Sequence, residues 1–189
     1  MTGDGSWRAF GGPGGIGYQL FHRLRLRLNQ KLVTFLLGHL KKNPPPRPLL
    51  VLEAGCGPAQ ASALLNEEIG VAAVGLDYDH EALREAHAFE PSLMLVQADL
   101  TRIPFRDASF DCVWNSSTLE HLPDLGLGLK EMVRITRPGG LVFVGVPSRR
   151  GPLFFQRWIA GTELGIWIGT VFTKAELARL FHEYGLAGC

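Results

Sequence analysis

The chain has 189 residues, 46% apolar and 20% charged, which is ordinary for one globular domain with a substantial core. No apolar stretch is long enough to span a membrane, and the first residues lack a signal-peptide pattern. The three cysteines, Cys56, Cys112 and Cys189, have neither metal-ligand nor disulfide spacing. The sequence therefore predicts a cytoplasmic protein with no metal site.

Residues 1–17 are rich in glycine, and we expect them to be flexible because glycine restricts the backbone little. Residues 18–48 are predicted to form a basic amphipathic helix, over 18–42, and a proline-rich linker. The apolar stripe of the helix consists of Phe21, Leu24, Leu28, Leu32, Phe35, Leu36 and Leu40.

The net charge of +1 is unevenly distributed, because no acidic residue lies between Gly5 and Leu52. A basic segment of this kind predicts contact of residues 18–42 with a membrane periphery or another anionic surface. The alternative is a solvated helix face. The basic residues of this segment are Arg8, Arg23, Arg25, Arg27, Lys31, Lys41, Lys42 and Arg47.

From residue 49 onward, short apolar runs alternate with helical patterns, which predicts a Rossmann-like three-layer α/β/α sandwich with a mostly parallel sheet. Thr173 and Glu176 form a capping box before the last helix, and Gly185 ends it. Strands are predicted at 49–53, 72–77, 93–97, 110–115 and 141–146, with helices at 60–68, 80–89, 125–136 and 174–184 and a turn at 137–140.

Ligands of such folds bind beyond the carboxyl ends of the strands. Gly55 and Gly57 follow the first strand and allow close approach of the backbone to a ligand, although a tight turn without a ligand is the alternative. Asp77 ends the second strand, where a carboxylate can accept hydrogen bonds from ribose hydroxyls. Tyr78 could stack on an adenine, and Asp99, after the third strand, could accept from an exocyclic amine.

These motifs together resemble those of the class I S-adenosylmethionine-dependent methyltransferases, in particular the small-molecule and quinone-type branch. The resemblance covers about residues 49–185 and implies that 49–189 is the methyltransferase domain. The motifs are Glu53-Ala54-Gly55-Cys56-Gly57, Val74-Gly75-Leu76-Asp77, Gln97-Ala98-Asp99-Leu100, Phe110-Asp111-Cys112-Val113 and Arg137-Pro138-Gly139-Gly140.

The resemblance implies S-adenosylmethionine as the cofactor. Glu53 and Gly55 would lie near its methionine part, Asp77 at the ribose, Tyr78 and Leu100 beside the adenine and Asp99 at the adenine amino group. The backbone around Asn115 would help to hold the methionine ammonium. Ala59 departs from the family, which commonly has a third glycine there, and we expect only a modest loss of fit. The predicted cofactor-binding residues are Glu53, Gly55, Cys56, Gly57, Asp77, Tyr78, Asp99, Leu100 and Asn115.

His121, just after the fourth strand, is the predicted catalytic base, if the acceptor must lose a proton. The alternative is a histidine that caps or hydrogen-bonds a loop. His22 and Tyr18 are weaker candidates. Cys56 and Cys112 are interpreted as small buried residues rather than nucleophiles, because neither has an evident base partner.

Residues 147–172 carry an aromatic cluster beside Arg149, Arg150 and Arg157. This insertion favours a small apolar or lipid-like acceptor, with an anionic group as an option, whereas the alternative is that it packs on the sheet or on the first helix. The chain ends at Cys189, so the C-terminal strand pair of the family is expected to be missing. The fifth strand would then be an open edge, which predicts a truncated form, a shortened isoform or a dimer that covers this edge.

The leading hypothesis is an enzyme that methylates a small molecule. A catalytically weak or inactive module that binds a partner is the alternative. A nicotinamide-dependent oxidoreductase fits the fold but lacks the glycine spacing for a dinucleotide. Nucleic acid is not the expected partner, because no base-reading module is present.

Overall fold

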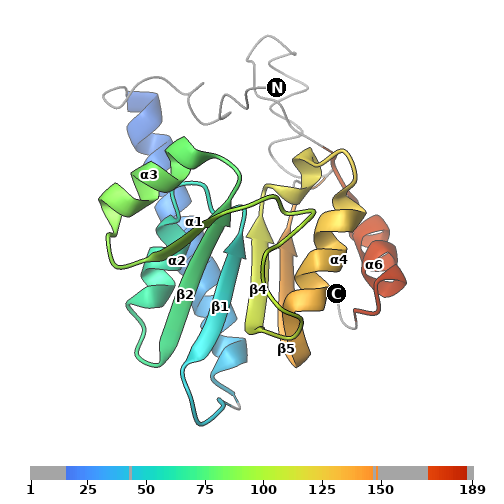
Figure 1. Ribbon diagram of the computed structural model, residues 1–189. Helices are drawn as coiled ribbons and strands as arrows, with labels where there is room; N and C mark the ends of the chain where they lie inside the picture. Colours follow the sequence, from blue (N-terminus) through green and yellow to red (C-terminus); the bar gives the residue numbers. More distant parts are fainter. Residues whose placement is uncertain (1–15, 43, 147, 149–169, 187–189) are drawn as a thin grey trace.

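The computed structural model describes residues 16–42, 44–146, 148 and 170–186 (Figure 1). Within them, five parallel strands form one sheet in the order β3-β2-β1-β4-β5, which confirms the predicted fold class. The strands are β1 (Leu49–Ala54), β2 (Val71–Asp77), β3 (Met94–Gln97), β4 (Phe110–Ser116) and β5 (Thr136–Gly145). The helices are α1 (Ile16–Leu40), α2 (Gln60–Asn66), α3 (His80–Phe89), the 3₁₀ helix η2 (Leu119–His121), α4 (Leu125–Ile135) and α6 (Lys174–Glu183).

Alternate residues of the strands face two separate apolar cores, one on each side of the sheet. On one side Leu36 of α1 and Leu65 of α2 pack with Val51 of β1. On the other side Met132 and Ile135 of α4 pack with strand residues of the opposite parity. Figure 1 shows α1, α2 and α3 on one side and α4 and α6 on the other. The three-layer arrangement follows from this alternation, because a strand buried on both faces needs helices on both faces.

Helix α1 is buried only in part. Val33 and Leu36 lie in the core, whereas the side chains of Leu28 and Phe35 are 57% and 47% exposed. Among its described side chains, the predicted apolar stripe is therefore only partly covered. None of the described helices is both long enough and apolar enough to cross a bilayer.

The predicted turn at residues 137–140 is not a turn but part of β5, which begins directly after α4. The pairing of β4 with β5 shifts between Phe110 and Cys112, so that the additional residues of β5 form a bulge. Gly139 has a φ of +77°, and a Cβ at Gly140 would lie 2.8 Å from the backbone oxygen of Asp111. The two glycines let the chain bulge without leaving the sheet, which is why turn-like residues occur inside a strand.

The last helix agrees with its prediction. Thr173 caps α6, and the reciprocal bonds of Thr173 with Glu176 form the expected capping box. Gly185, with a φ of +74°, follows the helix. The expectations for flexible residues 1–17 and for the aromatic insertion fall largely outside the described residues, and so do the side chains of Tyr18 and His22.

Candidate cofactor site at the strand tips

The turn after β1 has the shape that its glycines predict. Gly55 has a φ of +79° and Gly57 a φ of +52°. A Cβ at Gly55 would lie 2.5 Å from Oγ1 of Thr118, so only glycine fits there. The N–H groups of Gly55 and Cys56 donate to the carbonyl of Leu76, at 2.7 and 2.9 Å. The turn is thereby fastened to the carboxyl end of β2.

Asp77 stands at that end and is half-buried. Its carboxylate accepts hydrogen bonds from the backbone N–H of Gly57 at 2.6 Å and from that of Asp79 at 2.9 Å. These bonds orient the carboxylate beside the glycine turn and leave further lone pairs for a ligand. The next residue, Tyr78, is 75% exposed, so its ring is available for stacking.

Glu53 is buried at the end of β1. Its carboxylate accepts from both the backbone N–H and the hydroxyl of Ser62, in the first turn of α2. Glu53 therefore anchors the helix that follows the turn. Sequence reasoning missed Ser62, because a serine within a helical pattern carries no signal for such a contact.

Asp99 and Leu100 follow β3 and differ in environment. Asp99 is exposed, and its carboxylate accepts from the N–H and the hydroxyl of Thr101, both at 2.8 Å. Leu100 is buried with Ile103 and Leu119, so its side chain contributes to the core. The contact of Leu100 with an adenine remains an expectation from the family.

Asn115, near the end of β4, is fully buried and joins two strand tips. Its side-chain amide nitrogen donates to the carbonyl of Ala54, and its side-chain oxygen accepts from the N–H of Leu119 at 3.1 Å. The sequence assigned a role only to the backbone here. The signal was a polar residue at the end of an apolar strand, which must find partners when it is buried.

The 3₁₀ helix η2 carries two titratable residues. His121 is half-buried, and this burial lowers its pKa, which favours the neutral imidazole. Glu120 is only 2% exposed, and burial raises its pKa to about 7. Among the described residues, Oε2 of Glu120 has no hydrogen-bond partner. Sequence reasoning missed Glu120, because nothing in the pattern indicates that this acid is buried.

Two smaller expectations concern Cys56 and Ala59. The thiol of Cys56 is buried, and burial raises its pKa, so it stays protonated as expected for a packed residue. Cys112 is also buried, and its pKa is raised to about 12 for the same reason. Ala59 lies before α2 with a φ of +50°, a conformation that costs an alanine about 1 kcal/mol relative to glycine.

The strand tips thus bring together the glycine turn, Asp77, Asn115 and η2. The backbone at Gly55 leaves no space for a side chain, and an oriented carboxylate lies next to it; both features fit an adenosine-bearing cofactor. The described residues contain no group of three acids, histidines or cysteines that could hold a metal ion.

Comparison with known proteins agrees with this geometry. Residues 52–144 match the family model of a methyltransferase domain. The chain is 36% identical over 135 residues to a malonyl-[acyl-carrier protein] O-methyltransferase of Pseudescherichia vulneris, covering 71% of this chain and 52% of that one. It is 39% identical over 94 residues to a demethylmenaquinone methyltransferase of Beutenbergia cavernae, covering 50% and 39%.

Solved structures show the same fold. An S-adenosylmethionine-dependent methyltransferase of Thermotoga maritima superposes with a TM-score of 0.67 at 18% identity, covering 97% of this chain and 82% of that one. A geranyl diphosphate methyltransferase in complex with geranyl diphosphate and sinefungin has a TM-score of 0.65 at 22% identity, covering 93% and 66%. The chain belongs to the class I S-adenosylmethionine-dependent methyltransferases. It spans about half the length of the curated relatives that it matches.

Proposed function

We propose that this protein transfers the methyl group of S-adenosylmethionine to a small apolar or lipid-like acceptor. The observation that carries the proposal is the carboxylate of Asp77, held by the N–H of Gly57 beside a turn with no room for a side chain. The acceptor class is supported by relatives named for a quinone precursor and for an acyl-carrier-bound malonyl group.

The cofactor, when bound, supplies a methyl group already activated on a sulfonium. The chain itself therefore needs mainly to bind and orient its ligands. In this proposal Asp77 accepts from the ribose hydroxyls, Tyr78 stacks on the adenine and Asp99 accepts from the adenine amino group. The turn at Gly55, together with Glu53, approaches the methionine part.

His121 takes the acceptor proton when the acceptor must lose one. Its burial favours the neutral imidazole, which is the form that can accept a proton. The position of His121 in η2, three residues after Thr118, which contacts Gly55, places it at the same edge of the sheet as the turn.

Two measurements test the proposal. Isothermal titration calorimetry with S-adenosylmethionine and with S-adenosylhomocysteine should show binding of both, and the Asp77→Ala variant should bind both weakly. A screen with isotope-labelled methyl groups against quinols, phenols and free carboxylates should then show transfer. Absence of cofactor binding contradicts the proposal. Cofactor binding without methyl transfer to any acceptor favours the alternative, a catalytically weak or inactive module that binds a partner.

We also propose that α1 contacts an anionic lipid surface. Arg27 and Lys31 are exposed beside Leu28, whose side chain is 57% exposed. Exposed apolar side chains among cations are typical of helices that lie in a membrane interface. The protein should sediment with vesicles that contain phosphatidylglycerol and not with pure phosphatidylcholine. Replacement of Arg27 and Lys31 by glutamine should abolish this; equal binding to both vesicles contradicts the proposal.

β5 is an edge strand among the described residues, and we propose that two copies of the chain pair there. Light scattering after size-exclusion chromatography should give a dimer. A monomer at all concentrations contradicts this pairing. The cytoplasmic setting expected from the sequence stays a prediction.

A further inference from the structure

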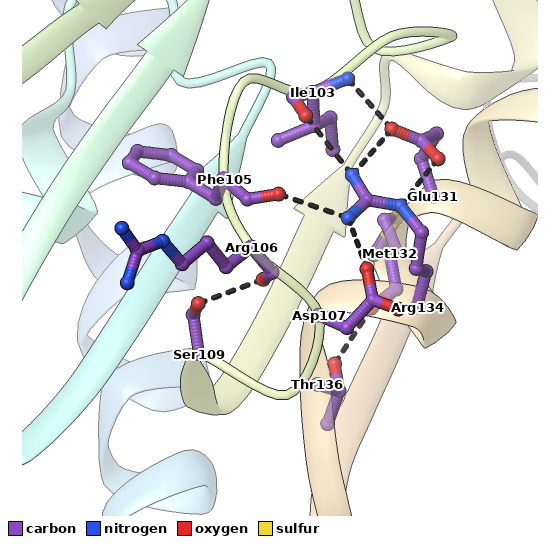
Figure 2. Close-up of polar contacts among 9 residues, drawn as sticks. All are labelled: Ile103, Phe105, Arg106, Asp107, Ser109, Glu131, Met132, Arg134 and Thr136. Carbon is purple, nitrogen blue, oxygen red and sulfur yellow. Dashed lines mark hydrogen bonds and ion pairs between the residues drawn. The ribbon is translucent and has the colours of Figure 1, made fainter.

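The connection between β3 and β4 is fastened to α4 by one arginine (Figure 2). The guanidinium of Arg134 donates to the carbonyl of Ile103 at 3.0 Å and to that of Phe105 at 2.9 Å. It also pairs with Asp107 at 2.7 Å. Five N–H donors in a planar fork let one arginine satisfy all three partners, whereas a lysine cannot span them.

Glu131, one turn earlier on α4, completes this contact. Its carboxylate pairs with Arg134 at 2.7 Å and accepts from the N–H of Ile103 at 2.8 Å. The hydrogen bond from Arg134 lowers the pKa of Glu131, so that this carboxylate is charged at neutral pH. Ile103 is thus held through both its N–H and its carbonyl. We call Arg134, Glu131 and Asp107 the α4 clamp.

The clamped segment starts at Asp99. Thr101 is bonded to the carboxylate of Asp99, and Ile103, two residues further, is bonded to the α4 clamp. Leu100, between Asp99 and Thr101, belongs to the same apolar core as Ile103. Asp99 itself is exposed, and Ala98 before it donates to the carbonyl of Asp77 at 3.0 Å. The direction of the Asp99 carboxylate is set by its bonds to Thr101, and therefore by the segment that follows.

We propose that Arg134 is a positioning residue of the cofactor site. It holds the segment after β3 so that the carboxylate of Asp99 stands where the amino group of an adenine can donate to it. This inference rests on the proposed function, because it takes the adenine position from that proposal. Arg134 does not touch the ligand; it acts through Ile103, Thr101 and Asp99.

The test compares two ligands that differ in one group. S-Adenosylhomocysteine carries the 6-amino donor, and its analogue with hypoxanthine in place of adenine carries a carbonyl there. We expect the wild-type chain to prefer the adenine form by about tenfold, because a hydrogen bond to a charged acceptor is lost in the analogue. In Arg134→Ala this ratio of dissociation constants should fall at least about threefold.

A loss of folding stability alone would not change this ratio. Arg134→Lys keeps a cation and provides a second variant if Arg134→Ala does not fold; its ratio should be intermediate. The matched control is Arg47→Ala. Arg47 makes a two-bond pair with Asp111, at 2.7 Å for each bond, at the amino end of the sheet. This variant should lose stability and keep the wild-type ratio.

The outcomes separate the two proposals. If the wild-type chain binds neither ligand, the proposed function is wrong. If it binds both and Arg134→Lys and Arg134→Ala keep the wild-type ratio, only the positioning role is wrong. A ratio that falls equally in Arg47→Ala also overturns the positioning role, because the effect would then be general.

Discussion

The carboxylate of Asp77, the last residue of β2, accepts a hydrogen bond from the backbone N–H of Gly57, which follows β1. The bond joins the acid at the tip of β2 to the glycine turn at the tip of β1. A ligand that approaches the turn therefore also meets a carboxylate whose direction is already fixed. This arrangement reduces the ordering that a ligand must impose on the site.

Replacement of Asp77 by alanine should raise the dissociation constant for S-adenosylmethionine about 100-fold, because two hydrogen bonds to a charged acceptor are lost. Calorimetry measures this directly. The Asp77→Asn variant keeps one oxygen for the N–H of Gly57, but it loses the charge and the acceptor for the N–H of Asp79. It should lose less stability than Asp77→Ala and still bind more weakly than the wild-type chain; wild-type affinity in both variants would contradict the assignment.

Gly55→Ala should destabilise the protein and prevent cofactor binding. The added Cβ would lie 2.5 Å from Oγ1 of Thr118, in a backbone conformation that disfavours alanine. We expect a loss of at least about 2 kcal/mol in the free energy of unfolding, from the strained φ and the overlap together. Urea denaturation monitored by circular dichroism measures it.

Thr118→Ala separates the two causes in a double-mutant cycle. Removal of the hydroxyl and methyl relieves the overlaps with Oγ1 and Cγ2 but leaves Cβ of residue 118 at 2.7 Å and the strained φ, so the double variant should recover part of the loss. Strictly additive losses would show that the two residues do not collide. Gly70→Ala is the matched control, because Gly70 also has a φ of +79° but open space around its Cβ position.

Because Glu120 is buried, we expect the free energy of unfolding of the protein to fall as the pH rises. Burial raises its pKa from 4.5 to about 7, so between these values the unfolded chain loses a proton that the folded chain keeps. The unfolded state then binds fewer protons, and the free energy of unfolding decreases with pH. Ionising the buried carboxyl of Glu120 costs the folded state about 3 kcal/mol in full above the raised pKa of about 7, and nothing below the usual pKa of 4.5.

Glu120→Gln removes this titration. The variant should be more stable than the wild-type chain at about pH 8 and equally stable at about pH 4. Thermal unfolding across this range measures the difference. Glu67→Gln, at an exposed position, is the control and should show no such dependence. A variant that is less stable than the wild-type chain at high pH would show that the Glu120 carboxylate is stabilised in the folded state.

His121→Asn should lower kcat by about 100-fold or more for an acceptor that must lose a proton, and leave cofactor affinity unchanged. Because burial lowers the pKa of His121, the wild-type kcat should decline only below the usual range of histidine titration. Steady-state kinetics across pH measure both effects. An unchanged kcat would leave His121 with a purely structural role in η2.

The sequence predicted the fold well where the pattern was local. Short apolar runs between helical patterns located the five strands of the described sheet, and Thr173 with Glu176 located the start of the last helix. The glycines at 55 and 57 correctly indicated a tight turn beside Asp77. Each of these features, whether a periodic pattern, a helix cap or a glycine with positive φ, depends only on residues that are close in the sequence.

The rest depended on contacts between distant residues. The bulge in β5 reads as a turn, because Pro138 and two glycines usually end an element. The burial of Glu120 and the bonds of Asn115 become visible only when β4 lies beside β1. The exposure of Leu28, which lies on the predicted apolar stripe, likewise cannot be seen from helical periodicity alone.

The bond from Asn115 to Ala54 joins residues 61 positions apart in the chain. β1, β2 and β3 pair in sequence order, but β4 must return past them to reach the other side of β1. Closing so long a loop is slow, since its entropy is lost before the contacts form. During synthesis, the tips of β1 and β4 are therefore joined only after β4 has left the ribosome and docked beside β1, whereas the bond between Gly57 and Asp77 needs β1 and β2 alone.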